Sequence, residues 1–306
     1  MWLRIGMLLL MAGAWAWAQE SPPPKGNADG CWAFGDPIVG ITDQLQKLAG
    51  AHGGNQLFYF PTHDTPASPA DWGCKFENVS FKSGDGTLLD GWFIPAKGRK
   101  ANGTVVFSHG NAGSLGYHLG FVIWLAEAGY NVLMYDYRGF GKSGGHIDRR
   151  GMVDDVKAAF VYVARRADVN PGRLISYGHS LGGAQSVTAM GESPVKGLCA
   201  VVTDGAFASY QAMARVACGR LGAGLVSDEL SPKDYVQKIS PVPLLVIHGT
   251  MDQVVPVAQG HVLFDAACQP KTLFEVKAGH HGDSLARDNG AFRVRMLMWL
   301  ADVMNR

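Results

Sequence analysis

Short apolar runs rich in β-branched and aromatic residues alternate with longer stretches of helical periodicity from residue 76 onward. The first two runs are separated by a polar, glycine-containing turn at 83–86, which predicts a β-hairpin. The later runs are apolar on both faces, as buried parallel strands are. Eight strands are predicted in this way, at 76–82, 88–94, 104–108, 131–135, 174–177, 200–203, 244–247 and 272–276.

Stretches with helical spacing of apolar residues lie between these strands, at 114–128, 151–167, 181–190, 257–267 and 286–303. The alternation predicts an α/β fold with a mostly parallel eight-stranded sheet and helices on both faces. The interval 205–243 has room for one crossover helix and a small lid. We therefore predict one large domain over 76–306, preceded at 19–75 by a linker and an N-terminal extension.

The first 18 residues have the pattern of a secretory signal peptide. Arg4 supplies a positive charge, an apolar stretch follows, and Ala16-Trp17-Ala18 offers a small-x-small cleavage pattern before Gln19. The apolar segment is shorter than the about 20 residues that a membrane-spanning helix requires. We therefore expect a secreted or periplasmic protein with no strong attraction to a membrane after cleavage.

Composition excludes several classes of protein. The 306 residues carry 27 Lys and Arg against 26 Asp and Glu, so no basic face is available for nucleic acid. The 47% hydrophobic content excludes a disordered chain. Neither a partner surface nor an oligomeric state is predicted, and we expect no nucleic-acid partner.

Five cysteines remain after the predicted cleavage, and an exported protein can form disulfides. Two pairs, Cys31 with Cys74 and Cys218 with Cys268, are possible bridges, while Cys199 precedes an apolar run and is expected to be buried. The sequence lacks the Cys-x-x-Cys and His-Glu-x-x-His spacings of common zinc sites. We predict no metal and no other cofactor.

The segment 174–184 places Gly-x-Ser-x-Gly directly between a predicted strand and a predicted helix. In this context Ser180 would occupy a tight, strained turn with its hydroxyl standing clear of the sheet. Gly178 and Gly182 would keep Cβ atoms out of the space where the turn closes. The following helix directs its free N–H groups at an anion formed there, with Leu181 N–H as one donor.

Two further segments, 107–113 with His-Gly-Asn-Ala-Gly and 135–143 with Asp-Tyr-Arg-Gly-Phe-Gly-Lys-Ser, extend the pattern. With them the sequence resembles the serine α/β-hydrolase superfamily, most closely a cap-poor branch with a His-Gly-Asn-Ala-Gly oxyanion loop. The likeness runs from about residue 76 to the C-terminus. It implies that the α/β-hydrolase domain is catalytic and that Asn111 supplies a second backbone N–H to an oxyanion. It implies no chemistry for 135–143.

A nucleophilic serine needs a histidine base, which a carboxylate holds in the correct tautomer. In this fold the acid and then the histidine follow the serine along the chain. Asp252 fits the position of the acid because it lies after the strand at 244–247 and just before a helix whose start is indicated by Pro256. Asp204, after the preceding strand, is a rival position.

Two adjacent histidines compete for the role of base. Aligning the family's Gly-x-His loop, with Asp one residue beyond the histidine, on 279–283 selects His281, whereas aligning on Ala-Gly-His selects His280. We favour His281 and keep His280 as the alternative base.

These residues predict a serine hydrolase that acts by acyl transfer to water on a small-molecule or acylated substrate. An ester or thioester is the first choice, because esterases are common on this fold. A serine peptidase or amidase with the same triad, and a catalytically silent binding protein on a hydrolase scaffold, are the alternatives.

Overall fold

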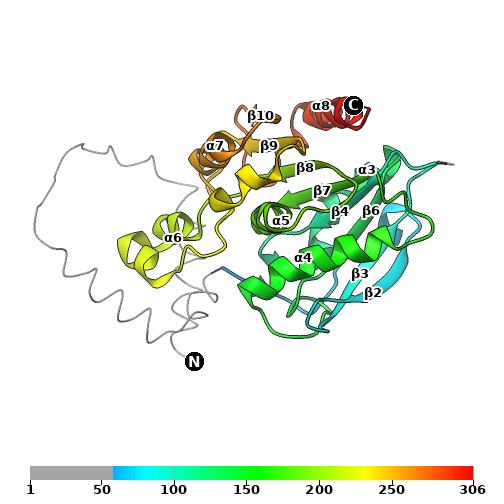
Figure 1. The fold of residues 1–306 in the computed structure, drawn as a ribbon, viewed down its shortest axis with the longest axis horizontal. Coiled ribbons are helices and arrows are strands. Elements are labelled where there is room, and N and C mark those ends of the chain that lie inside the picture. The colour runs from blue at the N-terminus through cyan, green and yellow to red at the C-terminus, as the bar shows by residue number, and fades with distance from the viewer. Residues whose placement is uncertain (1–57, 99, 306) are drawn as a thin grey trace, which may run out of the picture. The chain divides into compact units, whose positions relative to one another are not determined.

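The computed structural model describes residues 58–98 and 100–305 (Figure 1). The predicted signal peptide, the proline-rich linker after it and Cys31 lie outside the described residues. Among the described helices, none has both the length and the apolar character needed to cross a membrane.

An eight-stranded sheet with the order β10-β9-β8-β7-β4-β6-β3-β2 forms the centre of the fold. Strand β3 pairs antiparallel with β2 and with β6, and the other neighbours are parallel. The predicted mostly parallel sheet and its opening hairpin are confirmed. The strands are β2 (Glu77–Lys82), β3 (Leu88–Ile94), β4 (Thr104–Ser108), β6 (Asn131–Tyr135), β7 (Leu174–His179), β8 (Leu198–Asp204), β9 (Leu244–Gly249) and β10 (Lys271–Val276).

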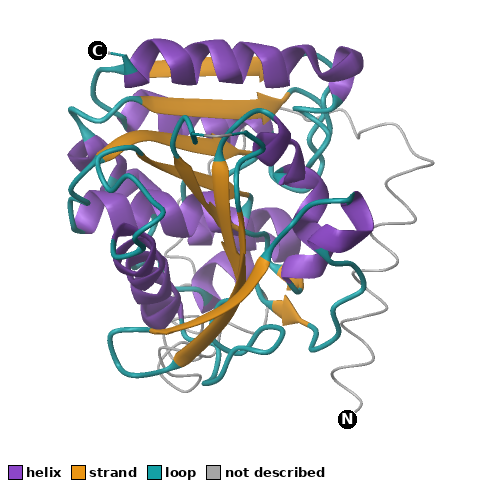
Figure 2. Ribbon diagram, turned by 90° about the vertical axis from the view of Figure 1, so that its right-hand side faces the viewer, coloured by secondary structure: helices purple, strands orange, loops and turns teal. Residues whose placement is uncertain are grey.

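Helices cover both faces of this sheet (Figure 2). One buried apolar cluster contains residues of α4 (Arg149–Ala164), α5 (Leu181–Glu192) and α7 (Val257–Ala266). A second cluster, on the other face, contains residues of α3 (Ile123–Glu127) and α8 (Arg287–Met304). Alternate side chains of a central strand feed the two clusters: Val106 of β4 belongs to the first, and Phe107 to the second.

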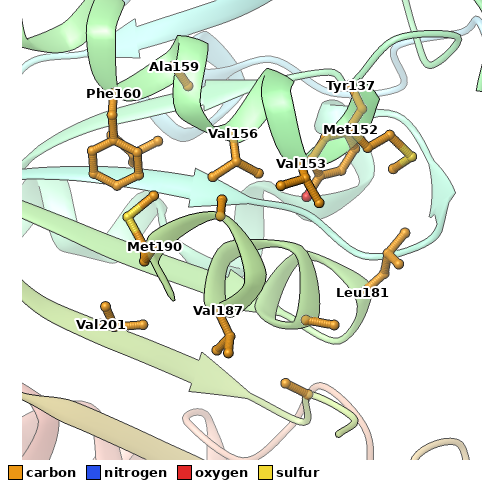
Figure 3. Packing of buried hydrophobic residues seen from close by; sticks show 14 of the residues in the cluster. Tyr137, Met152, Val153, Val156, Ala159, Phe160, Leu181, Val187, Met190 and Val201 are labelled. Atoms are coloured by element: carbon orange, nitrogen blue, oxygen red, sulfur yellow. The ribbon is translucent and has the colours of Figure 1, made fainter. Parts of the chain in front are cut away.

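Helix α5 is the most deeply buried helix of the described chain, since every residue from Leu181 to Gly191 is buried. Figure 3 shows Phe160 of α4 next to Met190 of α5, and Val156 of α4 pointing toward α5. Full burial of one such side chain contributes roughly 1.5–3 kcal/mol to stability. This packing fixes the position of the helix N-terminus, where Ser180 lies.

The interval 205–243 contains α6 (Tyr210–Leu225) and two 3-10 turns, Pro232–Asp234 and Val236–Ile239. Ser209 begins α6, and its hydroxyl accepts a 3.1 Å hydrogen bond from the N–H of Ala212. Gly219, with φ of 65°, interrupts the helix. Most of the outer positions of α6 are exposed, and Figure 1 shows the helix apart from those that pack on the sheet.

The structure corrects the predictions made for the helix at 114–128 and for the cysteines. The helix expected at 114–128 is a 3-10 helix, Leu115–Phe121, followed by the short α3, because Val122 between them has a non-helical φ of −133°. Cys218 and Cys268 are free thiols on the surface, so the bridge expected between them is absent. Cys74 is also a free thiol, and Cys31, its expected partner, lies outside the described residues. Cys199 is half-buried rather than buried.

Candidate active site

Ser180 lies in the turn between β7 and α5 with φ of 53° and ψ of −119°. A positive φ is uncommon and costly for a residue with a side chain, and such strain gathers at functional sites. The backbone N–H of Ser180 donates a 2.9 Å hydrogen bond to the carbonyl of Asp204 on β8, which holds the turn against the neighbouring strand. The structure thus gives Ser180 the strained strand–turn–helix position that the motif predicts.

The two glycines of the motif are required by close backbone contacts. A Cβ atom on Gly182 would lie 1.9 Å from the carbonyl oxygen of Ser108, and one on Gly178 would lie 2.4 Å from the carbonyl oxygen of Gly182. Both distances are far below any real carbon–oxygen contact. The absence of Cβ atoms therefore lets the first turn of α5 lie directly on the end of β4, where the loop with Asn111 begins.

The two predicted oxyanion donors lie just beyond the carboxyl ends of two neighbouring strands. Leu181 is the first residue of α5, and Asn111 follows the end of β4, the strand next to β7. Among the described residues, neither backbone N–H donates a hydrogen bond to another group. Both donors are therefore available to a ligand, as an oxyanion site requires.

A segment before the first long strand braces the Asn111 loop. Strand β1 (Phe60–Pro61) pairs in parallel with β5 (Ala112–Gly113), and the N–H of Phe60 donates a 2.8 Å bond to the carbonyl of Asn111. The amide Nδ2 of Asn111 donates a 2.9 Å bond to the carbonyl of Phe58. The sequence of this segment predicts no role for it, because two-residue strands carry no periodic pattern.

Asp252 lies in the loop after β9 and binds one of the two candidate bases. Its Oδ2 lies 2.7 Å from Nδ1 of His281, and its Oδ1 accepts bonds from the backbone N–H groups of Val254 and Val255. Burial alone would raise the pKa of Asp252, but hydrogen bonds from His248, His281 and Val255 outweigh it and hold this pKa well below its usual value. Asp252 is therefore an anion that accepts a hydrogen bond from the N–H at Nδ1 of His281.

His280 is placed differently from His281. Its Nδ1 lies 3.1 Å from the carbonyl of Met251, and its side chain is exposed. The His281 ring is partly buried and lies 4.8 Å, between centroids, from the ring of His179, the residue before Ser180. The structure thus brings Asp252 and His281 together beside the Ser180 turn and leaves His280 outside.

No hydrogen bond joins the Ser180 hydroxyl to His281 among the described residues. Such bonds are often long in free enzymes and tighten when substrate binds. The position of Gly205, the residue after Asp204, shows that the loop after β8 lies close to the loops that carry Asp252 and His281. A Cβ atom on Gly205 would lie 3.2 Å from Nδ1 of His281 and 3.4 Å from Oδ2 of Asp252.

Three further imidazoles, those of His109, His118 and His179, pack together near the turn that carries Ser180. His179 stacks on Phe121 with ring centroids 4.1 Å apart, and His118 stacks on His109 at 5.1 Å. Burial lowers the pKa of His118 to about 3 and holds that of His179 well below its usual value. The rings of His118 and His179 are therefore neutral near pH 7. Among the described residues, no group of three or more metal-binding side chains is arranged to hold an ion.

Comparisons with known proteins agree with this geometry. The chain is 39% identical over 254 residues to the uncharacterized protein YfhR of Escherichia coli K12, a match that covers 81% of this chain and 88% of YfhR. It is 30% identical over 236 residues to the α/β hydrolase domain-containing protein WAV2 of Arabidopsis thaliana, covering 72% of this chain and 76% of WAV2. The chain belongs to the α/β-hydrolase superfamily.

The superfamily's solved structures share the fold of this chain. An esterase of Pyrococcus furiosus, Pf2001, superposes with a TM-score of 0.68 at 21% identity, covering 80% of this chain and 97% of the esterase. A family model described as serine aminopeptidase, S33, matches residues 99–238 of this chain. That match includes Ser180 but ends before Asp252 and His281, so the assignment of these two rests on their geometry.

Proposed function

We propose that the protein is an exported serine hydrolase that cleaves a carboxylic ester or thioester through an acyl-enzyme on Ser180. One observation supports this most strongly: the 2.7 Å Asp252–His281 pair lies next to a strained turn that carries a serine. A nucleophile, an acid and a base in the loops after β7, β9 and β10, at the carboxyl ends of these parallel strands, form the arrangement that activates a serine hydroxyl.

In the proposed reaction, the Ser180 oxygen attacks the substrate carbonyl while Nε2 of His281 accepts the hydroxyl proton. Asp252 holds Nδ1 of His281 protonated and stabilises the imidazolium. The tetrahedral oxyanion accepts hydrogen bonds from the backbone N–H groups of Leu181 and Asn111. Collapse breaks the bond to the alkoxide or thiolate, which receives the proton from His281. Water then repeats the sequence on the acyl-enzyme and releases the acid, so no cofactor is required.

Labelling with a fluorophosphonate tests the nucleophile. The mature protein should become covalently labelled on Ser180, and Ser180→Ala should not be labelled, because only a serine activated by a base reacts at a useful rate. Equal absence of label in both proteins would instead favour the alternative of a silent binding protein on a hydrolase scaffold. Circular dichroism of both proteins checks that the substitution leaves the fold intact.

The bond that is cleaved is a separate question. The match to a family described as serine aminopeptidase, S33, favours an amide or peptide as the second candidate substrate. A series of p-nitrophenyl esters with rising acyl-chain length, compared with aminoacyl-p-nitroanilides, separates the two. We expect faster ester hydrolysis, and higher kcat/KM on the anilides would replace this proposal with an aminopeptidase.

Export forms the other part of the proposal. The charged residue Arg4, the apolar stretch after it and the Ala16-Trp17-Ala18 pattern support cleavage after Ala18 and a secreted or periplasmic location. Expression of the full chain in a Gram-negative host, followed by N-terminal sequencing of the periplasmic fraction, tests it. The expected first residue is Gln19, and an intact Met1 in the cytoplasmic fraction would contradict export.

A further inference from the structure

Asp204 occupies a position beneath the nucleophile turn that the proposed reaction does not use. It is the last residue of β8 and lies opposite His179 in the ladder with β7. Its backbone carbonyl accepts the bond from Ser180 N–H, while its side chain is buried at 1% exposure. A buried carboxyl group this close to a catalytic loop requires an explanation.

The carboxyl group of Asp204 lacks the charged hydrogen-bond partner that buried acids normally have. Both of its oxygens are buried and make no hydrogen bond of good geometry among the described residues, and the neutral hydroxyl of Ser284 lies close enough to lower the pKa of the carboxyl. Asp155, a buried acid with a structural role, differs: it accepts bonds from the backbone N–H and the guanidinium of Arg138. An acid placed for stability would be paired in this way, because an unpaired buried carboxylate is costly.

The ionisable groups around Asp204 come from β7, from β9 and its loop, and from the loop before α8. The Oδ2 of Asp204 lies 3.9 Å from Nδ1 of His179. The groups that interact electrostatically with its carboxyl are Tyr177, His179, His248, Asp252 and His281. Burial holds the pKa of His179 well below its usual value, whereas bonds to Asp252 and Val255 outweigh burial and raise the pKa of His248. Of the imidazoles beside Asp204, His281 is the one that gains and returns a proton in the proposed reaction.

We propose that Asp204 is a second acid of this site, a positioning residue whose carboxylate stabilises the protonated His281 and partly replaces Asp252 when that residue is neutralised. This inference rests on the proposed function. It follows from the position of Gly205, whose backbone lies against both His281 and Asp252 and directly follows Asp204. Two carboxylates then flank one imidazole, Asp252 by a direct hydrogen bond and Asp204 through the electric field.

The charge state of Asp204 sets the pH range of this effect. Burial raises the pKa of Asp204 to about 6, and the nearby imidazoles of His281 and His248 limit the rise. Below that pH the group is neutral and contributes no field. Above it the carboxylate is present and contributes its field.

The first test measures the titration of His281 by NMR with labelled histidine. In Asp204→Asn, a substitution of nearly equal volume, the His281 midpoint should move to lower pH by about one unit, the lower end of the effect of a neighbouring opposite charge. The exposed His280 serves as an internal reference and should not move. A control variant, Glu275→Gln, removes a surface carboxylate on β10 and should leave both titrations unchanged. An unchanged His281 midpoint in Asp204→Asn overturns the proposal.

A second measurement needs no substitution at Asp204. In wild-type protein with carbonyl-labelled aspartate, the Asp204 carboxyl should titrate near pH 6, and the His281 resonances should report the same event. A His281 signal with a single titration step, unaffected by Asp204, also overturns the proposal. Neither NMR test depends on activity, so it separates failure of this inference from failure of the proposed hydrolase function.

Kinetics test the replacement of Asp252. The acid limb of the kcat/KM profile on p-nitrophenyl acetate should move to lower pH in Asp204→Asn. At pH 8 the double variant Asp252→Asn/Asp204→Asn should turn over at least about tenfold more slowly than Asp252→Asn. This factor corresponds to about one pKa unit of lost electrostatic stabilisation of the protonated His281. Equal rates in the single and double variants would show that Asp204 does not support His281.

Discussion

Asp252 and His281 are joined by a 2.7 Å hydrogen bond between Oδ2 and Nδ1, although 29 residues separate them in the chain. This bond fixes the tautomer of His281, because Nδ1 must carry the proton that Asp252 accepts. The lone pair of Nε2 is then the one available to a serine hydroxyl. His280 has no such partner, since its Nδ1 lies against the carbonyl of Met251.

Substitution of the two histidines should therefore have very different effects. His281→Ala is expected to lower kcat by about 10⁴-fold or more, because a triad without its base retains only the oxyanion hole and substrate binding. His280→Ala should retain most of the wild-type kcat/KM. Steady-state hydrolysis of p-nitrophenyl acetate measures both variants. Equal losses of activity would contradict the assignment of His281 as the base.

The Gly182 position should tolerate no side chain. A Cβ atom there would lie 1.9 Å from the backbone oxygen of Ser108, so α5 would have to move away from β4. We expect Gly182→Ala to destabilise the protein by more than about 3 kcal/mol, the upper range of ordinary overpacking. Gly120→Ala is the matched control, since no heavy atom lies within 4 Å of a Cβ there. Urea unfolding of both variants tests this, and similar midpoints would contradict the contact.

The strands and most of the helices could be predicted because each produces a local periodic pattern of apolar residues. All eight strands of the main sheet lie where alternating or continuous apolar runs predict them, and the turn with Ser180 follows from Gly-x-Ser-x-Gly between a strand and a helix. The two-residue strand β1 could not be found in the same way, because its pairing with β5 depends on a contact between segments about fifty residues apart.

The site was predictable only where a residue type and its loop position agree. Asp252 and His281 were selected by their loops, and the structure places them in contact. The sequence could not reveal that Asp204 is a buried acid without a charged hydrogen-bond partner, because burial and hydrogen bonding depend on the packing of β7, β8 and β9 together. The free state of Cys218 and Cys268 likewise depends on their positions in space and not on their number.

The amide of Asn111 should support catalysis indirectly. Its Nδ2 bonds to the carbonyl of Phe58 and helps to hold the loop whose backbone N–H is the proposed oxyanion donor. Asn111→Ala keeps that N–H but loses the brace, so we expect kcat to fall by about tenfold, less than the ~10²–10³ of removing a donor itself. Asn102→Ala, which loses an exposed bond to Ala128, is the control and should be unaffected. A wild-type kcat in Asn111→Ala would show that the brace is dispensable.

Asp204 should also make the stability of the protein depend on pH in a direction that can be predicted. Its pKa is raised in the folded state from 3.8 to about 6, so the folded protein binds the proton more tightly than the unfolded chain does. The stabilisation is complete below pH 4 and is lost as the pH rises through about 6. A difference of about two units corresponds to roughly 3 kcal/mol, an upper figure for a buried group.

Asp204→Asn cannot ionise, so it should escape this loss. Its free energy of unfolding relative to wild type should therefore rise between pH 4.5 and pH 8, by up to roughly 3 kcal/mol. Urea unfolding at the two pH values measures the change, with Glu275→Gln as a control in which removal of an exposed carboxylate leaves the pH dependence of wild type. The opposite sign, a variant that loses stability relative to wild type at pH 8, would mean that the carboxylate of Asp204 is paired in the folded protein, and the electrostatic role proposed for it would then need a different partner from His281.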